Sequence, residues 1–453
     1  MTVAYSEIGV ALWTNRYHGN YGDRAQAIAV DHNGNVIVTG SSDGSGGRTD
    51  YATVAYSPAG VPLWTNRYSG PGDFNDHANA VAVDGNGNVF VTGTSGDLPF
   101  SDYATVAYSA GGVPLWTNRY DAPSRGEDQA VAVAVNSSGN VFVTGYSDAD
   151  YATIAYSVAG AALWTNRYNT FPAVLTSDFA TAMAVDRNGN VFVTGSSDDF
   201  DFITTTFATV AYSSAGVPLW TNWYNKPGAF HSVANAIAVD RNGNVFVTGV
   251  SLQNSNYDAD YATIAYSGAG VALWTNRYDG PINGPDTAMA VAVDGNGTVF
   301  VTGVSRGRGT ADDYATIAYS GAGMPLWTNR YNGPANGNDE PGVGSCLAIG
   351  PDGAVYVTGA SDGDYGVFTA YDYATVKYVW HPNLAIQPLV AGSSTVNLNV
   401  SGPPNSSWVI ERALMITGPW TNLGLSLIGA NGSGSFRDVD PSDKGAFYRV
   451  IQP

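Results

Sequence analysis

The sequence is short of cysteine and of basic residues, and each shortage excludes a class of protein. Its 453 residues contain one cysteine, Cys346, so no disulfide can form within the chain. No histidine stands near Cys346 in the sequence, and we therefore expect a small buried hydrophobic side chain and no nucleophile. Lys and Arg number 19 against 38 Asp and Glu, which gives a net charge of −19. Nucleic acid is excluded as a partner, because binding phosphate requires Lys and Arg.

Long apolar runs and metal-binding spacings are also missing. No apolar run approaches the roughly 18 residues of a membrane-spanning helix, so we expect no membrane span. The histidines fall at unlike positions, without His-x-His or His-Glu-x-x-His spacing for zinc: His18, His32, His77, His231 and His381. The sequence therefore predicts no catalytic residue.

What the sequence does contain is a repeat of about 50 residues, the period of a stacked supersecondary unit. The segment Tyr51–Tyr68 recurs almost unchanged from Tyr103, Tyr151, Phe207, Tyr261 and Tyr314. Its alternating aromatic, small and β-branched residues predict two strands, at 51–57 and 61–68, joined by the turn Pro58-Ala59-Gly60. Two more strands are predicted at 80–83 and 89–93, around the Asn-Gly hairpin of residues 84–88.

Four short antiparallel strands per repeat are typical of a β-propeller blade. We name them by their expected place in a blade: inner (80–83), second (89–93), third (51–57) and outer (61–68). The Trp-Thr-Asn motif of the outer strand occurs seven times, at Trp13, Trp64, Trp116, Trp164, Trp220, Trp274 and Trp327. We predict an all-β fold with a seven-bladed β-propeller over residues 1–379.

The recurring Asp-Tyr-Ala-Thr-Val, Trp-Thr-Asn-Arg-Tyr and Gly-Asn-Val-Phe-Val-Thr-Gly motifs resemble SBBP repeats, the seven-bladed β-propeller repeats of bacterial secreted and surface proteins. The resemblance implies an extracellular or cell-surface location; the family has no agreed activity, so no catalytic residues can be transferred from it. No signal peptide precedes Thr2, so the start shown is expected to be a mature or truncated one.

The connections between strands differ in how much they vary among repeats. The turns between inner and second strands, such as Asp84–Asn88, and those between third and outer strands are nearly uniform, whereas the other two loops differ in every repeat. In an antiparallel blade both variable loops emerge at one end, which we call the variable end. Because function usually lies on loops over a fixed scaffold, the variable end is the predicted ligand face; neutral drift is the alternative. The Asp-x-Asn-Gly-Asn turns lack the Glu of a calcium loop and are interpreted as hairpin turns.

An Asp before the third strand and an Arg closing the outer strand recur together. Folding the hairpin about its turn places Asp50 opposite Arg67, and the one repeat with Thr206 in place of Asp also has Trp223 in place of Arg. We predict structural cross-strand ion pairs, worth roughly 0.2–1 kcal/mol each if exposed. The pairs are Asp50–Arg67, Asp102–Arg119, Asp150–Arg167, Asp260–Arg277, Asp313–Arg330 and, across the two ends of the propeller, Asp372–Arg16.

A second Asp recurs eight residues before the end of the inner strand, with Ser232 and Gly342 interrupting the series. If the inner strands line the axis, these carboxylates approach the channel mouth and could attract a cation such as calcium. The alternative is that each accepts N–H bonds within its own loop. The residues are Asp23, Asp76, Asp128, Asp178 and Asp286.

Beyond the repeats we predict a linker at 380–383 and a small β-sandwich-like module at 384–453. The third strand is present at both ends of the repeat region, as 2–6 and 373–378. We expect 373–378 to close the ring by inserting between 355–359 and 10–17.

Two functions are predicted. The first is a non-enzymatic, extracellular binding propeller, expected to be monomeric, with a protein or glycan partner at the variable end. The second is a carbohydrate-active hydrolase or lyase that uses carboxylates of that end.

Overall fold

The computed structural model describes residues 1–453 except 7–8, 20–21, 45–46, 73, 97–99, 124–125, 171–176, 199–203, 226–229, 253–258, 343–345, 352, 363–370, 379–382, 387–395, 402–406, 414–420, 430–432, 439–446 and 452–453. The described residues contain strands and no helix. By their contacts they form two compact units. The first is Met1–Val239 with Gly249–Ala259 and Gly268–Gly270; the second is Asp240–Thr248 with Asp260–Ser267 and Val271–Pro453.

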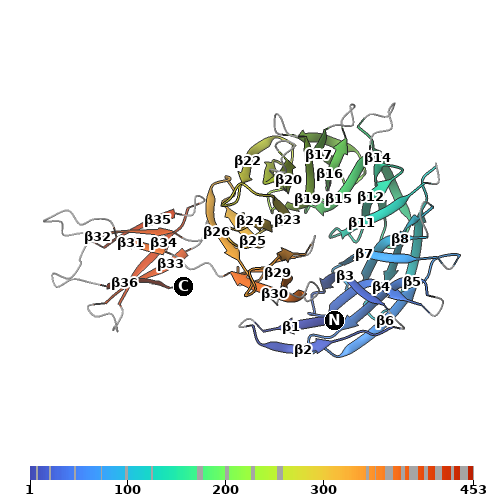
Figure 1. The fold of residues 1–453 in the computed structure, drawn as a ribbon, viewed down its shortest axis with the longest axis horizontal. Coiled ribbons are helices and arrows are strands. Elements are labelled where there is room, and N and C mark those ends of the chain that lie inside the picture. The colour runs from blue at the N-terminus through green and yellow to red at the C-terminus, as the bar shows by residue number, and fades with distance from the viewer. Residues whose placement is uncertain are drawn as a thin grey trace. The chain divides into compact units, whose positions relative to one another are not determined.

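The predicted four-strand repeat is present in six sets, each running inner, second, third, outer in hydrogen-bonding order (Figure 1). The described strands of a seventh set are inner, second and third. The first three sets are β3 (Asp23–Val30), β4 (Val36–Asp43), β5 (Thr49–Tyr56), β6 (Pro62–Tyr68); β7 (Asp76–Val83), β8 (Val89–Ser95), β9 (Asp102–Tyr108), β10 (Pro114–Tyr120); and β11 (Asp128–Val135), β12 (Val141–Ser147), β13 (Asp150–Tyr156), β14 (Ala162–Tyr168). The next two are β15 (Asp178–Val185), β16 (Val191–Asp198), β17 (Thr205–Tyr212), β18 (Pro218–Tyr224); and β19 (His231–Val239), β20 (Val245–Leu252), β21 (Ala259–Tyr266), β22 (Ala272–Tyr278).

The sixth set follows the same order, and the seventh consists of a divided inner strand, a second strand and a third strand. They are β23 (Asp286–Val293), β24 (Val299–Arg306), β25 (Asp312–Tyr319), β26 (Pro325–Tyr331); and β27 (Asp339–Pro341), β28 (Leu347–Ile349), β29 (Val355–Asp362), β30 (Tyr371–Tyr378). In the seventh set the inner strand is divided into β27 and β28, both paired with β29. Cys346 lies between them and is buried, which raises the pKa of its thiol to about 12 and keeps it unreactive.

The inner strands begin earlier than predicted, because a β-bulge lets them continue. In β7 the register shifts between Ala78 and Ala80, and the strand then reaches back to Asp76 opposite Ser95. Gly93 lies opposite the bulge, where an added Cβ would collide with the carbonyl oxygen of His77. The glycine of the Val-Thr-Gly motif is therefore required by the close approach of the inner strand.

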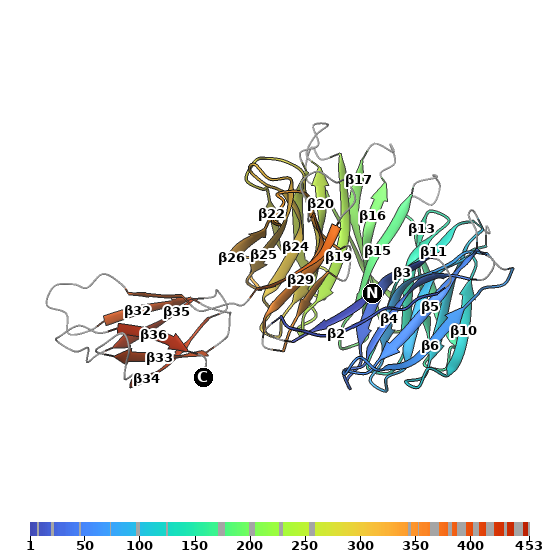
Figure 2. The ribbon, with the colours of Figure 1, turned by 60° about the horizontal axis from the view of Figure 1, so that its bottom comes forward.

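The core lies between neighbouring sheets. Tyr51 and Ile37 of the first sheet pack with Val91, Ala104 and Val106 of the second. In the view of Figure 2 the strands of the first unit run between two ends of the sheets, and the connecting loops lie at these ends. The largest fully buried side chains are the first aromatic of the third strand, from Tyr51 to Tyr314, and the phenylalanines of the second strand.

The tryptophan of the outer strand forms a recurring contact that we call the tryptophan clasp. Trp64 lies half-buried on the ring of Tyr108, with ring centroids 5.8 Å apart, and its Nε1 donates to the carbonyl of Ala110 at 3.0 Å. Asn66 Nδ2 donates to the carbonyl of Gly112 at 2.7 Å. Gly112 has φ 79°, and an added Cβ would meet the Trp64 ring. Tyr51 thus fills the interior of the contact between two neighbouring sheets, which we call the joint, and Trp64 lies at its edge.

Ring closure is described on one side of β30, which pairs with β29 as expected. β1 (Thr2–Tyr5) pairs with β2 (Ala11–Asn15). The insertion of 373–378 beside 10–17 would join the two units, and it stays a prediction. A hairpin across a short turn loses less chain entropy than a pairing between chain ends, which favours the local partner. Tyr373 of β30 is 74% exposed, whereas its counterparts in the other repeats are buried.

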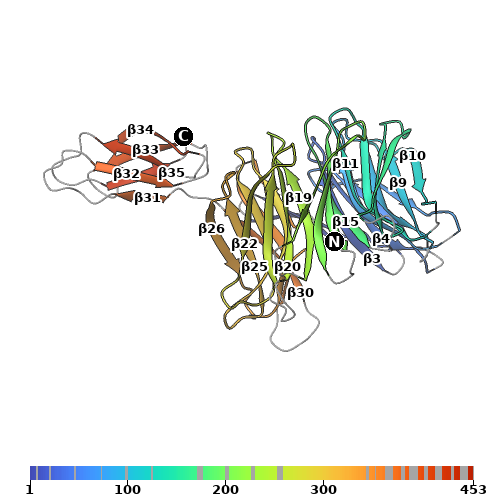
Figure 3. The same cartoon turned by 90° about the horizontal axis from the view of Figure 1, so that it is seen from above.

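The C-terminal module is a small two-layer sandwich (Figure 3). One layer is β31 (Asn383–Ile386), β32 (Val396–Ser401) and β35 (Ser433–Asp438); the other is β34 (Thr421–Leu427), β33 (Ser407–Ala413) and β36 (Phe447–Ile451). Its core contains Leu398, Val400 and Ile410. Of the predicted linker, residues 380–382 lie outside the described residues, and Asn383 begins β31.

Candidate functional site

Salt bridges stand at the variable end of five sheets. The Arg Nη2 to Asp Oδ2 distances are 2.8 Å for Arg67–Asp50, 2.6 Å for Arg119–Asp102, 2.7 Å for Arg167–Asp150, 2.5 Å for Arg277–Asp260 and 2.8 Å for Arg330–Asp313. The predicted register is wrong: Arg67 lies opposite Ala52 and not Asp50, because the register shifts between Ala55 and Tyr56, so Arg67 reaches its partner diagonally. The side chain of Asp260 is only 3% exposed, so the expectation of exposed pairs is too simple. Arg16 and Asp372 belong to different units, and their pairing stays a prediction.

Arginines of this series also connect neighbouring sheets, as Arg119, Arg167 and Arg330 do. Arg119 Nη1 donates to Ser95 Oγ and, at 3.3 Å, to the hydroxyl of Tyr68 on the preceding sheet. Where the Arg is replaced, Trp223 Nε1 donates at 2.8 Å to Tyr168, the corresponding tyrosine. The position therefore needs a donor directed at the preceding sheet, and the ion pair is one part of a larger network.

The five recurring aspartates of the inner strands accept N–H bonds within their own loops. The donors are Gly19 to Asp23 (2.7 Å), Gly70 to Asp76 (2.6 Å), Ala122 to Asp128 (2.8 Å), Thr170 to Asp178 (2.9 Å) and Gly280 to Asp286 (2.5 Å). All except Asp23 are fully buried. Each thus caps a loop, the second of the two interpretations given above.

One member of this series was not predicted from the sequence. Asp339 accepts from the N–H of Gly333 at 2.5 Å and is fully buried, so the seventh set has a counterpart where Gly342 was read as a gap. Because the inner strand is divided, Asp339 lies farther from the end of that strand than its counterparts do, and the spacing used for the series does not find it. The six-residue spacing from Gly333 to Asp339, shared by Gly70 and Asp76, would have found it.

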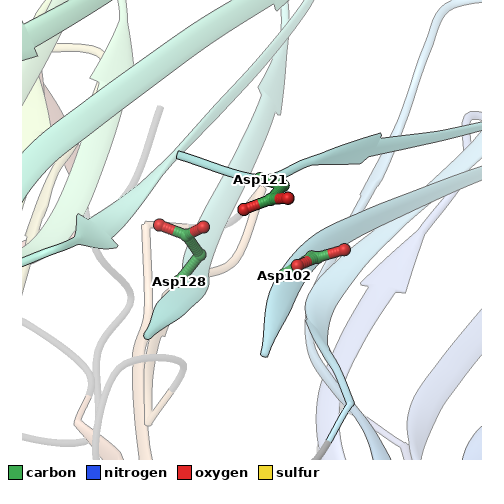
Figure 4. A group of neighbouring side chains, drawn as sticks. All are labelled: Asp102, Asp121 and Asp128. Atoms are coloured by element: carbon green, nitrogen blue, oxygen red, sulfur yellow. The ribbon is translucent and has the colours of Figure 1, made fainter. Parts of the chain in front are cut away.

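Two of these aspartates lie in groups of three carboxylates, which we call the carboxylate triads. One oxygen from each of Asp102, Asp121 and Asp128 lies within 4.8 Å of the others, and Figure 4 shows their carboxylates around a common space. The second triad, in the other unit, has the same spacing and consists of Asp260, Asp279 and Asp286.

The repeat explains how a triad forms. In the first triad, Tyr103 pairs with Tyr120, so Asp102 and Asp121 are the next residues along the third and outer strands. Asp128 begins the inner strand of the following sheet, β11. Burial falls from Asp128, which is fully buried, through half-buried Asp102 to exposed Asp121. Asp121 and Asp279 were not singled out from the sequence, although both directly follow the Trp-Thr-Asn-Arg-Tyr motif.

The triad position that directly follows the Trp-Thr-Asn-Arg-Tyr motif differs among repeats, and the residue there sets the charge of the group. It is Ser69, Asp121, Asn169, Asn225, Asp279, Asn332 and His18 in the seven cases. Asn169 donates from Nδ2 to Asp150 Oδ1 at 2.6 Å. An aspartate at the same position adds a negative charge and removes that donor.

Burial makes the inner carboxylates weaker acids. It raises the pKa of Asp286 to about 6, and the neighbouring charge of Asp279 acts in the same direction, against hydrogen bonds from Ser305 and Gly280. Burial also raises the pKa of Asp128, where Asp148 and Asp102 add to the effect and Ser147 and Ala122 oppose it.

The raised pKa of Asp286 predicts a pH-dependent effect of Asp286→Asn. Since the folded-state pKa lies above the ordinary value of 3.8, the folded protein binds the proton more tightly than the unfolded chain does. Loss of that proton from Asp286 therefore lowers the free energy of unfolding as pH rises from about 4 to about 6. Asn avoids this loss, so the variant should be more stable than the parent above pH 7, by roughly 1–3 kcal/mol. Urea unfolding at pH 4 and pH 8 measures the difference.

The exposed Glu340→Gln is the control for this prediction, because it removes a carboxylate from the surface of the same unit. It should leave the pH profile almost parallel to that of the parent. An Asp286→Asn gain that is the same at both pH values would contradict the assignment.

Six sets of four antiparallel strands, ordered from inner to outer, and a seventh set whose described strands are inner, second and third make this chain a β-propeller protein with a C-terminal sandwich module. Within it, residues 164–203 and 231–255 match the beta-propeller repeat named SBBP, as the motifs predicted. No curated protein matched the sequence. In the described part of the chain there is no helix that could serve as a membrane span.

Several solved propeller structures are similar at low identity. Sqt1 from Chaetomium thermophilum has a TM-score of 0.49 and 13% identity, covering 74% of this chain and 80% of its own. The polysaccharide lyase Uly1 has a TM-score of 0.46 and 14% identity, covering 83% and 92%. The β-propeller domain of the Trilobed protease from Pyrococcus furiosus has a TM-score of 0.44 and 7% identity, covering 79% and 96%. These similarities assign no activity to this chain.

Proposed function

We propose that this protein is a non-enzymatic, extracellular binding propeller that takes a protein or glycan at its variable end. The observation that carries the proposal is the contrast between the two ends of the sheets. At the uniform end the third–outer turns repeat one hydrogen bond, from the N–H of the residue before the outer strand to a serine Oγ, as from Val61 to Ser57 at 3.1 Å. The same bond recurs at Ser109, Ser157, Ser213, Ser267 and Ser320. The loops at the other end differ in length and composition.

Exposed aromatic side chains at the variable end favour this assignment. Phe100, in the loop between β8 and β9, is 72% exposed, and Phe74, in the loop before β7, is 43% exposed. Exposed rings supply contact area for a protein partner and a stacking surface for a sugar. The net charge of −19 favours neutral or basic ligands.

The experiment is a glycan array and a peptide array probed with the full chain and with two double variants. Phe74→Ala with Phe100→Ala alters the variable end. Leu63→Ala with Leu115→Ala is the matched control on the outer strands, since both leucines are exposed to a similar degree as Phe74. We expect the first variant to lose most of the array signal and the second to retain it. The reverse pattern, or no signal above background for the parent, would overturn the proposal.

The hydrolase or lyase alternative has one favourable observation, the raised pKa of Asp286 beside the carboxylate of Asp279. A general acid needs such a raised pKa, but it must also touch the glycosidic oxygen. Asp286 is fully buried and accepts the N–H of Gly280, which favours binding over catalysis. A hydrolysis screen of polysaccharides on the same sample tests the alternative, and turnover that disappears in Asp279→Asn would establish it.

A further inference from the structure

We propose that each carboxylate triad binds one calcium ion. The inference is independent of the ligand proposed above. Its geometric basis is that the three oxygens of a triad lie within 4.8 Å of one another. Calcium binds oxygen at about 2.3–2.6 Å, so ligands on opposite sides of the ion are about 5 Å apart. Three oxygens at this spacing fit around one ion without a change of backbone.

A buried oxygen without a hydrogen bond lies in each triad. Oδ1 of Asp128 and Oδ1 of Asp286 accept none, and both side chains are fully buried. The hydroxyls of Ser147 and Ser305 lie close enough to lower the pKa of these carboxyls, but no hydrogen bond of normal geometry reaches either Oδ1. A buried carboxylate oxygen that lacks a donor requires a proton or a cation.

The charge of a triad calls for a divalent ion. Arg119 contacts Asp102 through Oδ2 alone, at 3.1 Å from Nε and 2.6 Å from Nη2. One arginine thus offsets one of three carboxylates and leaves a net charge of about −2 within a few ångströms. In the second triad Arg277 pairs in the same way with Oδ2 of Asp260.

The donor set favours calcium over zinc. All triad ligands are carboxylates, the hard oxygen donors that calcium prefers, and the triads contain neither histidine nor cysteine. Three side chains leave several positions to water, as in weak extracellular calcium sites with dissociation constants of about 0.1–1 mM. The exposed Asp121 and Asp279 give the ion a path from solvent.

Calorimetric titration of the full chain with calcium chloride tests the proposal. We expect two ions per chain for the parent, one for Asp121→Asn or Asp279→Asn, and none for the double variant. Asparagine already occupies this position in another repeat as Asn169, so these changes are compatible with the fold. Calcium should also raise the melting temperature of the parent by a few degrees and leave that of the double variant unchanged.

Ser69→Asp provides a gain-of-site control. It places a third carboxylate beside Asp50 and the buried Asp76, whose Oδ1 also accepts no hydrogen bond, and should raise the stoichiometry from two to three. Phe100→Ala, outside both triads, should bind as the parent does. The proposal is overturned if the parent shows no saturable binding up to about 10 mM calcium, ten times the largest dissociation constant expected for such sites. It is also overturned if the double variant binds as many ions as the parent.

Discussion

Replacing Tyr103 by alanine should lower the free energy of unfolding by about 3–5 kcal/mol, the usual cost of emptying a large aromatic site. Tyr103 is 1% exposed, its ring lies 5.4 Å from that of Tyr120, and its hydroxyl donates to the carbonyl of Ala152 on the next sheet at 3.3 Å. The ring fills the interior of the joint between two sheets, where no other side chain can replace it. Urea denaturation followed by tryptophan fluorescence measures the loss.

Two further variants separate the parts of this joint. Tyr103→Phe removes only the hydroxyl and should cost about 1 kcal/mol. Trp116→Ala should cost less than Tyr103→Ala, because Trp116 is half-buried at the edge of the joint. A larger loss for Trp116→Ala would show that the clasp, and not the tyrosine, carries the stability of the joint.

Replacing Arg119 by methionine should lower the free energy of unfolding by about 2–4 kcal/mol, since hydrogen bonds to charged groups contribute about 1.5–3 kcal/mol each. The change leaves Asp102 without its cation and removes the donor to Tyr68 on the preceding sheet. This expected loss is smaller than that for breaking a fully buried ion pair, because the Arg119 side chain is 28% exposed. The same denaturation experiment measures it.

Arg187→Met is the control, because Arg187 is an exposed residue of an inner–second turn. It should change stability by less than about 0.5 kcal/mol. Equal losses for the two arginines would mean that the network of Arg119 contributes nothing beyond a surface charge.

Periodicity and turn residues were sufficient to predict the repeat, the strand order and the uniform turns. Asp84, for example, binds the N–H groups of Asn86 and Asn88 through Oδ1 and the side chain of Asn88 through Oδ2, as a hairpin turn requires. These features depend on neighbours within a few residues, so the local sequence specifies them.

Features that depend on the next sheet could not be read from one repeat. Tyr51 and Trp64 are both aromatic, and only packing against the following sheet decides that the first is buried and the second clasps the edge. The carboxylate triads were missed for the same reason, since Asp128 belongs to a different sheet from Asp102 and Asp121. The register that aligns Asp102 with Asp121 depends on a shift in the β9–β10 pairing, which alternation alone does not reveal.

The tryptophan clasp has a consequence for how such a gene can change. Trp13, Trp64, Trp116 and Trp164 of the first unit each donate to a carbonyl in the third–outer turn of the next sheet, and Trp274 does so in the second unit. Successive repeats of the described chain therefore carry both halves of the same connector. A duplication or deletion of one period, about 50 codons, would leave complementary halves facing each other at the new junction. Recombination between repeats can then alter copy number in a single event, while substitutions at the variable end proceed separately in each copy.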